Sequence, residues 1–485
     1  MRSNIMKFSF TIVIFVCWST LLTANDIQIS LEFPNYVNGH LCKDDNIALN
    51  FSNTVITSIG QNFINTPLIT CLNLTSIGIQ SIQKGAFNKL PNLIQIFMSN
   101  NNLNELFSFG GHENLKVLIL NSATTQYNNY YQPIVSEEYP NLEILSLRRN
   151  YIYDLRTTIE EIPFPKLKIL DLSSNNIRDT NFLELLTKSL YFLDLHDNSL
   201  TSLPFNKKQV NLFALNLNNN NLKYVRYNDS RDSFNPHNQY NRYNLHGFNT
   251  TYNRYNLPGY GLTMAGLENL HYLSISGNKI DFIESNAFED TTELIYLNLS
   301  TNNINYLYPE TFEKLHSLRL LDLSLNKFED VPQISSETVI SILSLNCNNI
   351  KSLISNAFVQ MPKLTKLLLG ENRIVEINVK AFAQLSLLEI LDLSRNELSF
   401  LPEGWSEPFT SLKYLLLNNN QFTSLESLSL TSILPLIEVY LAMNPLEYLD
   451  VNYFKSLPQN LTVNLVHGSS FAYWDSNKCK SNYYR

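Results

Sequence analysis

The sequence is poor in charge and has no basic segment. Charged residues make up only 16% of its 485 residues, and Lys and Arg form no block anywhere. The formal net charge is −8, and it becomes −8 − 2 = −10 without the first 24 residues, which carry Arg2 and Lys7 and no acid. This balance argues against nucleic acid and anionic membranes as main partners. The 44% of apolar residues suffices for a large core and argues against disorder.

Patterns of catalysis and metal binding are also missing. The eight histidines are dispersed, and none of them lies in a close metal-ligand spacing. The chain has no G-x-S-x-G motif, no phosphate-binding loop and no zincin helix. We therefore expect no enzymatic activity, no metal and no cofactor.

Only one long apolar run occurs, and it lies at the start of the chain. Phe8 to Leu22 follows Arg2 and Lys7 and is followed by Thr23-Ala24, which suits a cleaved secretory signal over residues 1–24. An uncleaved anchor is the alternative, but the run is short for a membrane span. Export fits six N-glycosylation sequons, although an Asn-rich and Ser-rich chain also produces sequons by chance. Their acceptors are Asn50, Asn73, Asn228, Asn249, Asn298 and Asn460.

One pattern, L-x-x-L-x-L-x-x-N-x-L, fills most of the chain. Clear copies begin at Leu93, Leu142, Leu167, Leu190, Leu212, Leu270, Leu294, Leu318, Ile340, Leu364, Leu388, Leu412 and Leu436, and degenerate copies at Ile69 and Leu115. In each copy the apolar residues alternate over a short strand, which cannot bury them alone. Stacking about fifteen copies into a parallel sheet buries one face of each strand and satisfies the hydrogen bonds of the strand backbone.

Two further positions recur with the pattern. A Phe stands ten residues after the Asn position as Phe87, Phe288, Phe312, Phe358 and Phe382, which predicts an apolar spine along the outer wall. The Asn amide can bond the backbone where the chain leaves the strand, so we interpret the Asn residues as a structural ladder. Its members are Asn101, Asn150, Asn175, Asn198, Asn220, Asn278, Asn302, Asn326, Asn348, Asn372, Asn396, Asn420 and Asn444.

These repeats resemble extracellular leucine-rich-repeat proteins of the 24-residue type, such as Toll-family ectodomains, chaoptin-like adhesion proteins and secreted insect immune proteins. The resemblance covers roughly residues 69–450. It implies an α/β solenoid, a horseshoe with a concave parallel β-sheet that binds proteins, glycans or lipids, and caps at both ends. Residues 25–68 would form the N-terminal cap, closed by a family-like Cys42–Cys71 disulfide, and residues 451–485 the C-terminal cap and tail.

The remaining cysteines depart from the family pattern. The cysteine cluster usual after the last repeat is missing, and only Cys479 follows it. Cys479 either forms an intermolecular disulfide, which would link the chain into an oligomer, or remains a free thiol in the tail. We expect Cys347, inside a regular repeat, to be a small and partly buried core residue.

The Asn ladder is interrupted between Asn220 and Asn278 by about 34 extra residues. This Tyr/Asn-rich insertion, near residues 227–261, contains a duplication, Asn241-Arg-Tyr-Asn-Leu and Asn253-Arg-Tyr-Asn-Leu. It is either a binding loop or a low-complexity insert without a role.

Alternation along the strands predicts which side chains face outward. Phe192, Tyr272 and Tyr296 would form an aromatic patch on the concave face, and Asp171 and Asp194 an acidic one for basic ligands. The sequence thus favours a secreted, non-enzymatic recognition protein, in innate immunity or signalling, that binds a protein or microbial ligand. A matrix or adhesion component and an inhibitor of a secreted enzyme are the alternatives.

Overall fold

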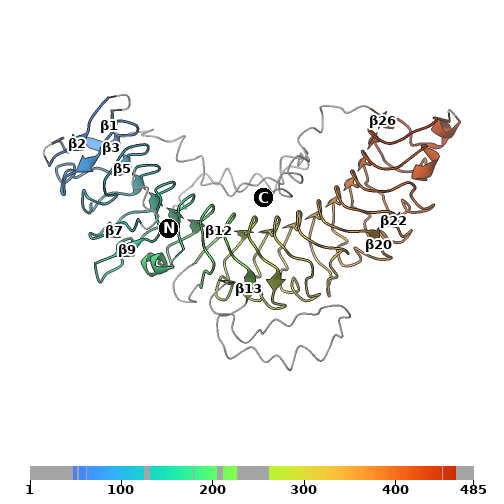
Figure 1. Ribbon diagram of the computed structural model, residues 1–485, viewed down its shortest axis with the longest axis horizontal. Helices are drawn as coiled ribbons and strands as arrows, with labels where there is room; N and C mark the ends of the chain where they lie inside the picture. The colour runs from blue at the N-terminus through green and yellow to red at the C-terminus, as the bar shows by residue number, and fades with distance from the viewer. Residues whose placement is uncertain are drawn as a thin grey trace, which may run out of the picture.

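The computed structural model describes residues 47–51, 54–61, 63–124, 131–178, 180–204, 211–226, 261–450 and 452–465. Seventeen strands form one parallel sheet, in which each strand pairs with the next one along the chain, and the stack curves into an arc (Figure 1). They are β1 (Ile47–Asn50), β3 (Ile69–Asn73), β5 (Gln95–Phe97), β6 (Val117–Ile119), β8 (Ile144–Ser146), β10 (Ile169–Asp171), β11 (Phe192–Asp194), β12 (Ala214–Asn216), β15 (Tyr272–Ser274), β17 (Tyr296–Asn298), β18 (Leu320–Asp322), β19 (Ile342–Ser344), β21 (Lys366–Leu368), β23 (Ile390–Asp392), β24 (Tyr414–Leu416), β25 (Glu438–Tyr440) and β26 (Thr462–Asn464).

The predicted repeat accounts for this sheet. The fifteen predicted copies are the strands β3 to β25 in order, and β1 and β26 add one strand at each end. In β23 and the residue after it, Leu391 and Leu393 are fully buried, while Ile390 and Asp392 face the other way. The same residues align across neighbouring strands, as Leu391 with Leu415. The solenoid with a concave parallel sheet is therefore confirmed.

The outer side of the solenoid is built differently from the expected α/β pattern. Four small parallel sheets lie there: β2 (Ser58–Ile59) with β4 (Ser81–Ile82), β7 (Ile134–Val135) with β9 (Arg156–Thr157), β13 (Tyr224–Arg226) with β14 (Gly261–Thr263) and β16 (Phe282–Ile283), and β20 (Ser352–Leu353) with β22 (Glu376–Ile377). Three short 3-10 helices, η3 (Asn181–Leu185), η4 (Glu426–Leu428) and η5 (Tyr453–Ser456), are the helical elements of the described ranges. Because the row of strands lies on the inner side of the arc, each turn occupies more length along the convex wall than along the sheet (Figure 1).

The predicted phenylalanine spine fills the space behind the sheet. Phe288 stacks on Phe312 at 6.3 Å between ring centroids, and Phe358 stacks on Phe382 at 6.0 Å. The row continues through Trp405, whose ring lies 6.1 Å from Phe382 and whose Nε1 donates a 3.0 Å hydrogen bond to the Leu428 carbonyl. The indole proton is thus satisfied inside the core.

The asparagine ladder joins each turn to its neighbours. The Nδ2 of Asn302 donates to the carbonyls of Ile275 and Leu299, each at 3.0 Å, and its Oδ1 accepts the Ile280 amide at 3.0 Å. Equivalent bonds recur along the solenoid, and the ladder residues from Asn101 to Asn420 are buried. The amide therefore satisfies backbone groups of two successive turns at the point where the chain leaves the sheet.

The strand residue that recurs as Asp or Asn has a second structural role. Asp322 Oδ1 accepts the backbone N–H of Ser324 at 2.9 Å, and the Asn298 side chain makes the same bond to Ser300 at 2.9 Å. The carboxyl or amide oxygen thus fixes the turn after the strand. Burial raises the pKa of Asp322, while the bonds from Ser324 and Ser344 oppose that shift.

The insertion leaves and re-enters the solenoid on its convex side. β13 ends at Arg226 and β14 begins at Gly261, and the two strands pair in parallel with Tyr224 opposite Gly261. A Cβ at Gly261 would lie 3.1 Å from the Tyr224 carbonyl oxygen, which accounts for glycine at this close approach. Residues 227–260 lie outside the described residues, but both anchors belong to the face opposite the concave sheet.

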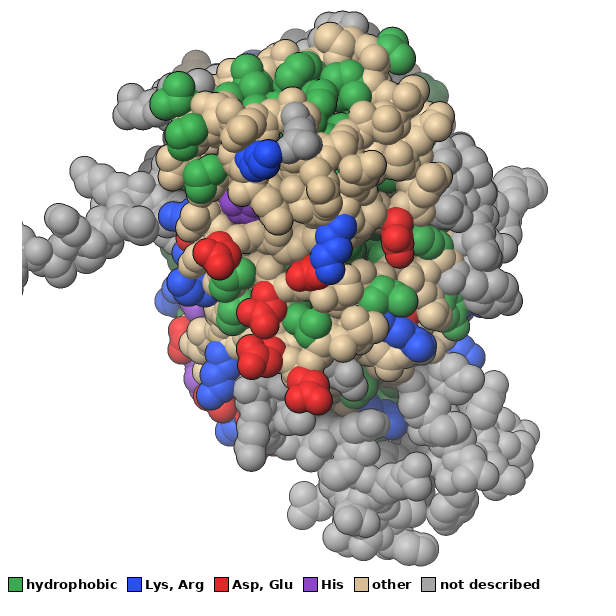
Figure 2. Space-filling view, turned by 90° about the vertical axis from the view of Figure 1, so that its left-hand side faces the viewer, with side chains coloured by type: hydrophobic (Ala, Val, Ile, Leu, Met, Phe, Trp, Pro, Cys, Tyr) green, Lys and Arg blue, Asp and Glu red, His purple; other side chains and the backbone are tan. Residues whose placement is uncertain are grey.

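The end of the solenoid at β1 is partly apolar. Figure 2 looks onto this side and shows hydrophobic side chains gathered in one part of it and charged side chains in another. Val55 is 86% exposed and Leu68 62% exposed at this end. An open solenoid end needs a cover, and most of the predicted cap, residues 25–46, lies outside the described residues.

Replacing one ladder asparagine should weaken the fold by several kcal/mol. In Asn302→Ala the buried Ile280 amide loses its acceptor, and the Ile275 and Leu299 carbonyls each lose one of two amide donors. One unsatisfied buried group and two lost hydrogen bonds together cost about 2–4 kcal/mol. Urea unfolding followed by far-UV circular dichroism measures the change. The adjacent, half-exposed Asn303→Ala is the matched control and should stay within about 0.5 kcal/mol. Equal losses in both variants would contradict the ladder's role.

Asp322→Asn should stabilise the protein at neutral pH. Because burial raises the pKa of Asp322 above 3.8, the folded state holds its proton more tightly than the unfolded state. Stability therefore falls as pH rises from about 3.8 through the folded-state pKa. Asn keeps the acceptor for Ser324 without the charge, so the urea midpoint of the variant should exceed that of the wild type at pH 7 and match it near pH 4. The exposed Asp330→Asn should change little at either pH, and a variant less stable at pH 7 would refute the argument.

Candidate functional site

Outward-facing side chains make a continuous apolar lane along the middle of the concave sheet. They come from six consecutive strands, β11 to β19, and stand side by side because the strands are in register. We call them the concave lane: Phe192, Ala214, Tyr272, Tyr296, Leu320 and Ile342. They alternate with the core leucines, so they form a cluster separate from the main core.

Three more rings extend the lane to the edge of the sheet. Tyr191 stacks on Phe213 at 4.6 Å between ring centroids, and Phe213 stacks on His271 at 4.3 Å. Phe213 also lies 5.4 Å from Tyr272, which in turn lies 6.4 Å from Tyr296. The rings of Tyr191, Phe213 and His271, which we call the rim stack, stand on neighbouring turns just before the strands.

The lane and the rim stack differ in accessibility. Tyr191 is 38% exposed, whereas Tyr272 is 6% and Tyr296 only 2% exposed. The predicted aromatic residues are therefore brought together, but the most accessible ring is Tyr191. Burial, with a smaller effect of Tyr272, raises the pKa of Tyr191 to about 12, so its hydroxyl stays neutral at physiological pH.

The predicted acidic pair is buried rather than exposed on the concave surface. Asp171 and Asp194 are both 0% exposed and are opposite each other on β10 and β11. Asp171 accepts bonds from Ser173 N at 2.9 Å and Ser146 Oγ at 3.0 Å, and Asp194 Oδ1 lies 2.7 Å from His196 Nδ1. The pair fixes turns and joins three repeats, which is the role that Asp322 has elsewhere.

Burial and neighbouring charges shift the pKa values of Asp171 and of His196. Burial first, and then the Asp194 charge, raise the pKa of Asp171. Burial lowers the pKa of His196, but the hydrogen bond and charge of Asp194 together with the Asp197 charge outweigh it, so the net shift is upward. The raised pKa favours the charged form of His196 beside Asp194, and because both carboxylates are buried the pair offers no exposed anion to a basic ligand.

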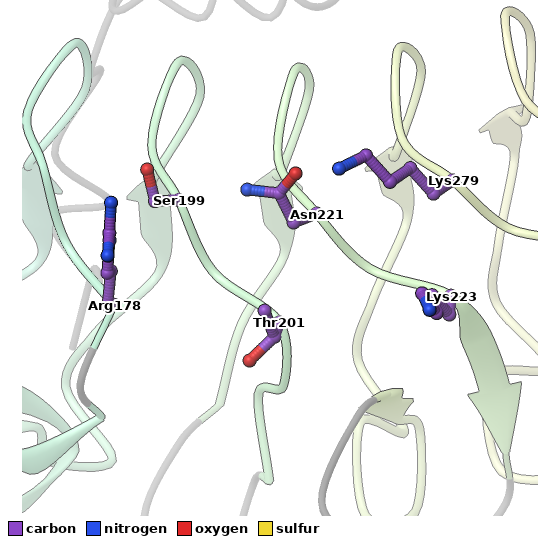
Figure 3. A pocket seen from close by; sticks show the side chains of 6 residues that line it. All are labelled: Arg178, Ser199, Thr201, Asn221, Lys223 and Lys279. Atoms are coloured by element: carbon purple, nitrogen blue, oxygen red, sulfur yellow. The ribbon is translucent and has the colours of Figure 1, made fainter.

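A polar pocket of about 330 Å³ lies beside the strands. Figure 3 shows its six lining side chains on neighbouring turns: Arg178, Ser199, Thr201, Asn221, Lys223 and Lys279. Each follows a ladder asparagine by one or three residues. Three cations without an acid among the lining residues suit an anionic group. No block of basic residues marks this pocket in the sequence, because its three basic residues come from three different turns.

Both described cysteines are disulfide-bonded. For Cys71 this agrees with the expected cap disulfide, but Cys42 lies outside the described residues, so the pairing stays a prediction. Cys347 is partly buried as expected, but it is disulfide-bonded rather than a simple core residue, and it lies in the left-handed region at φ 56°. Cys479 lies outside the described residues.

The described sequons differ in accessibility. Asn50 and Asn460 are exposed, whereas Asn73 and Asn298 are half-buried on the concave side, where their side-chain oxygens bond Thr75 N and Ser300 N. Asn228 and Asn249 lie outside the described residues. In the ranges that the structure describes, no cluster of His, Cys, Asp or Glu could hold a metal ion, and no helix is long and apolar enough to span a membrane.

Comparison with known proteins places the repeats in one family. The family model described as leucine rich repeat matches residues 67–123, 268–328 and 362–422. Bovine osteomodulin is 31% identical over 183 residues, which are 36% of this chain and 42% of osteomodulin, so the chain spans less than half of that relative. Mouse podocan is 28% identical over 456 residues, 88% of this chain and 71% of podocan.

Toll-type proteins also match. Chicken Toll-like receptor 2 type-1 is 34% identical over 107 residues, 22% of this chain and 13% of the receptor. A chain of the solved Toll–Spatzle complex from Drosophila shares the fold with a TM-score of 0.57 at 18% identity, covering 84% of this chain and 51% of that one. With the repeat, the ladder and the curved parallel sheet, these matches identify the fold as a leucine-rich-repeat solenoid, and the chain is similar in sequence to osteomodulin, podocan and Toll-type receptors.

Proposed function

We propose that this chain is an exported, non-enzymatic recognition protein that binds a macromolecular ligand through its concave sheet. The observation that carries the proposal is the joined surface of the concave lane and the rim stack. It places aromatic and aliphatic side chains from six consecutive strands on the side that faces away from the core.

The chemistry of this surface fits a binding role. The core positions are almost uniformly leucine, whereas the outward positions vary from Lys366 to Tyr296 and Asp392, so the outward set is not needed to close the core. An exposed apolar patch marks an interaction surface, and here the accessible part is Tyr191 with the half-buried Phe192 and Phe213. The rim stack offers flat rings to apolar side chains or sugar rings, and Tyr is a frequent anchor of interfaces.

The ligand class follows from the surface and from the relatives. A lane six strands long spans roughly 24 Å, since it crosses five strand-to-strand steps of about 4.8 Å. That length suits a protein segment or an extended glycan more than a small molecule. The fold match to Toll in its complex with Spatzle supports a protein ligand, and we place the function in recognition or signalling. The similarity to podocan and osteomodulin keeps a matrix component as the second candidate.

Export and glycosylation are the first part of the proposal to test. Expressed in insect cells, the full chain should appear in the medium with its first residue near Asn25, and peptide N-glycosidase should lower its mass. Asn460→Gln should remove one glycan because Asn460 is exposed. A variant lacking residues 2–24 is the control and should stay inside the cell. Retention of the full chain in the cell would contradict the proposal.

Binding should depend on the rim stack. Purified lipopolysaccharide, peptidoglycan and type I collagen serve as probes of the microbial and matrix classes, with secreted proteins of the source fluid as the protein class. For a probe that the wild type binds saturably, Tyr191→Ala should weaken the affinity about tenfold, or about 1.4 kcal/mol, because an interface anchor is lost.

A matched variant separates this effect from general damage. Tyr306 is 41% exposed and, like Tyr191, contacts another ring, but it lies away from the concave strands. Tyr306→Ala should leave the affinity unchanged, with thermal unfolding confirming that both variants fold. Equal affinities for wild type and Tyr191→Ala would remove the rim stack from the binding surface.

A further inference from the structure

Basic side chains stand in a row along one flank of the solenoid. They belong to the segments in which the chain passes from the ladder to the convex wall, as residues 221–223 do between β12 and β13. The turns of β10, β12, β15, β18 and β21 each contribute one residue, which follows the ladder asparagine by one or three positions. We call this row the basic flank: Arg178, Lys223, Lys279, Lys327 and Arg373.

The basic flank keeps its positive charge. All its members are exposed, and in the part of the chain that the structure describes none of them forms an ion pair. The nearby Lys351, by contrast, pairs with Glu329, with 3.0 Å between Nζ and Oε2. Asp281 also lies beside the flank: burial raises its pKa, and the charges of Lys223 and Lys327 oppose that rise. The flank is therefore positive although the whole chain carries a net charge of −8.

Part of the basic flank meets neutral donors in the pocket of about 330 Å³. The cations that line this pocket are Arg178, Lys223 and Lys279. The hydroxyls of Ser199 and Thr201 and the amide of Asn221 lie among them, and the Lys279 side chain points toward Asn221 (Figure 3). A sulfate or phosphate group combines charge with at least three acceptor oxygens, so it fits these donors better than a planar carboxylate does.

The backbone holds the cations at a fixed spacing. The N–H of Lys279 donates to the Leu222 carbonyl of the preceding turn at 2.9 Å, and the N–H of Lys327 donates to the Ile304 carbonyl at 2.8 Å. Each basic residue is thus anchored through its main chain, while its side chain extends into solvent. An alanine at such a position removes the charge and leaves the turn bonded as before.

The length and composition of the row indicate the class of anion. Surface clusters of Lys and Arg attract nucleic acids and sulfated polysaccharides such as heparin. From β10 to β21 there are seven strand-to-strand steps of about 4.8 Å, or roughly 34 Å, which suits an extended polyanion. Single-stranded nucleic acid is usually held by aromatic rings beside the cations, but the positions directly after the ladder asparagines from Ser199 to Arg373 carry only Ser, Asn, Lys and Arg. These polar side chains suit the hydroxyl-rich rings of a glycan.

We propose that the basic flank binds a sulfated polysaccharide, one sulfate of which occupies the pocket. This inference goes beyond the proposed function, because the flank lies beside the concave sheet and shares no residue with the concave lane or the rim stack. A chain with both surfaces would bind its macromolecular ligand and a sulfated glycan at separate places.

Heparin tests the charge requirement by isothermal titration calorimetry with the secreted full chain. We expect saturable binding, and at least about tenfold weaker binding of desulfated heparin. Lys223→Ala/Lys279→Ala should weaken the affinity for heparin about tenfold and lower the slope of log Kd against log salt by about one per lysine removed. Lys314→Ala/Lys363→Ala is the matched control: it changes the net charge equally at exposed lysines outside the flank and should keep the wild-type affinity.

A second pair of substitutions tests the length of the row. Lys327→Ala/Arg373→Ala leaves the pocket intact but should also weaken the affinity for heparin about tenfold, because a long polyanion contacts the whole row. The thermal unfolding midpoint of every variant should stay at the wild-type value, since the backbone bonds of the flank remain. Wild-type affinity in this variant would refute the extended row.

The other outcomes overturn the proposal in different ways. Failure of the wild type to bind heparin, or equal affinities of Lys223→Ala/Lys279→Ala and its control, would remove the flank as a glycan site. Binding of poly-glutamate or of a thymidine oligonucleotide as tightly as heparin would assign the flank to acidic proteins or to nucleic acid instead. Tyr191→Ala should bind heparin like the wild type, so a negative result at the flank leaves the proposed function of the concave sheet standing.

Discussion

The hydrogen bonds that cross from each turn to the next hold this molecule together. A strand of three residues cannot close a sheet or a core by itself, so every turn depends on its neighbours for both. The ladder asparagine completes this dependence, because Asn302 bonds the backbone of its own turn and of the preceding one. It also needs a fixed backbone: the residue before the asparagine adopts a positive φ in turn after turn, as at Thr301, Leu325 and Cys347. Each turn is therefore stabilised by its immediate neighbours, and the stability of a turn does not depend on the total number of turns.

That constraint separates the residues that fold the chain from those that are available for recognition. Leucines and ladder asparagines are fixed by packing and by bonding. The outward positions carry no such requirement, which allows a lane of aromatic and aliphatic side chains over β11 to β19 without cost to the core. The fifth position is an exception, because its Asp or Asn also fixes the turn after the strand. Its acidity is therefore a poor guide to ligand charge, and the enclosure of Asp171 and Asp194 illustrates this.

The sequence predicted most of what depends on periodicity. Residue spacing in the sequence predicts the fifteen repeats and their parallel pairing. It also predicts the buried ladder and the stacked phenylalanines. It failed where the outcome depends on residues distant along the chain. The basic pocket draws Arg178, Lys223 and Lys279 from three turns, and no local pattern marks the disulfide-bonded state of Cys347. Alternation gives the direction of a side chain, such as that of Tyr296, but not whether another segment covers it.

The insertion and Cys347 lie on different sides of the solenoid. The insertion begins and ends in a convex sheet, where Arg226 and Gly261 are held by pairing between β13 and β14. Cys347 lies at the edge of the concave sheet, next to the strands whose outward side chains are most enclosed. β13 is the next strand along the chain after β12, and β14 comes directly before β15, so the anchors of the insertion belong to the turns that carry Ala214 and Tyr272. A change at the convex anchors therefore has a short route along the chain to these two residues of the concave lane.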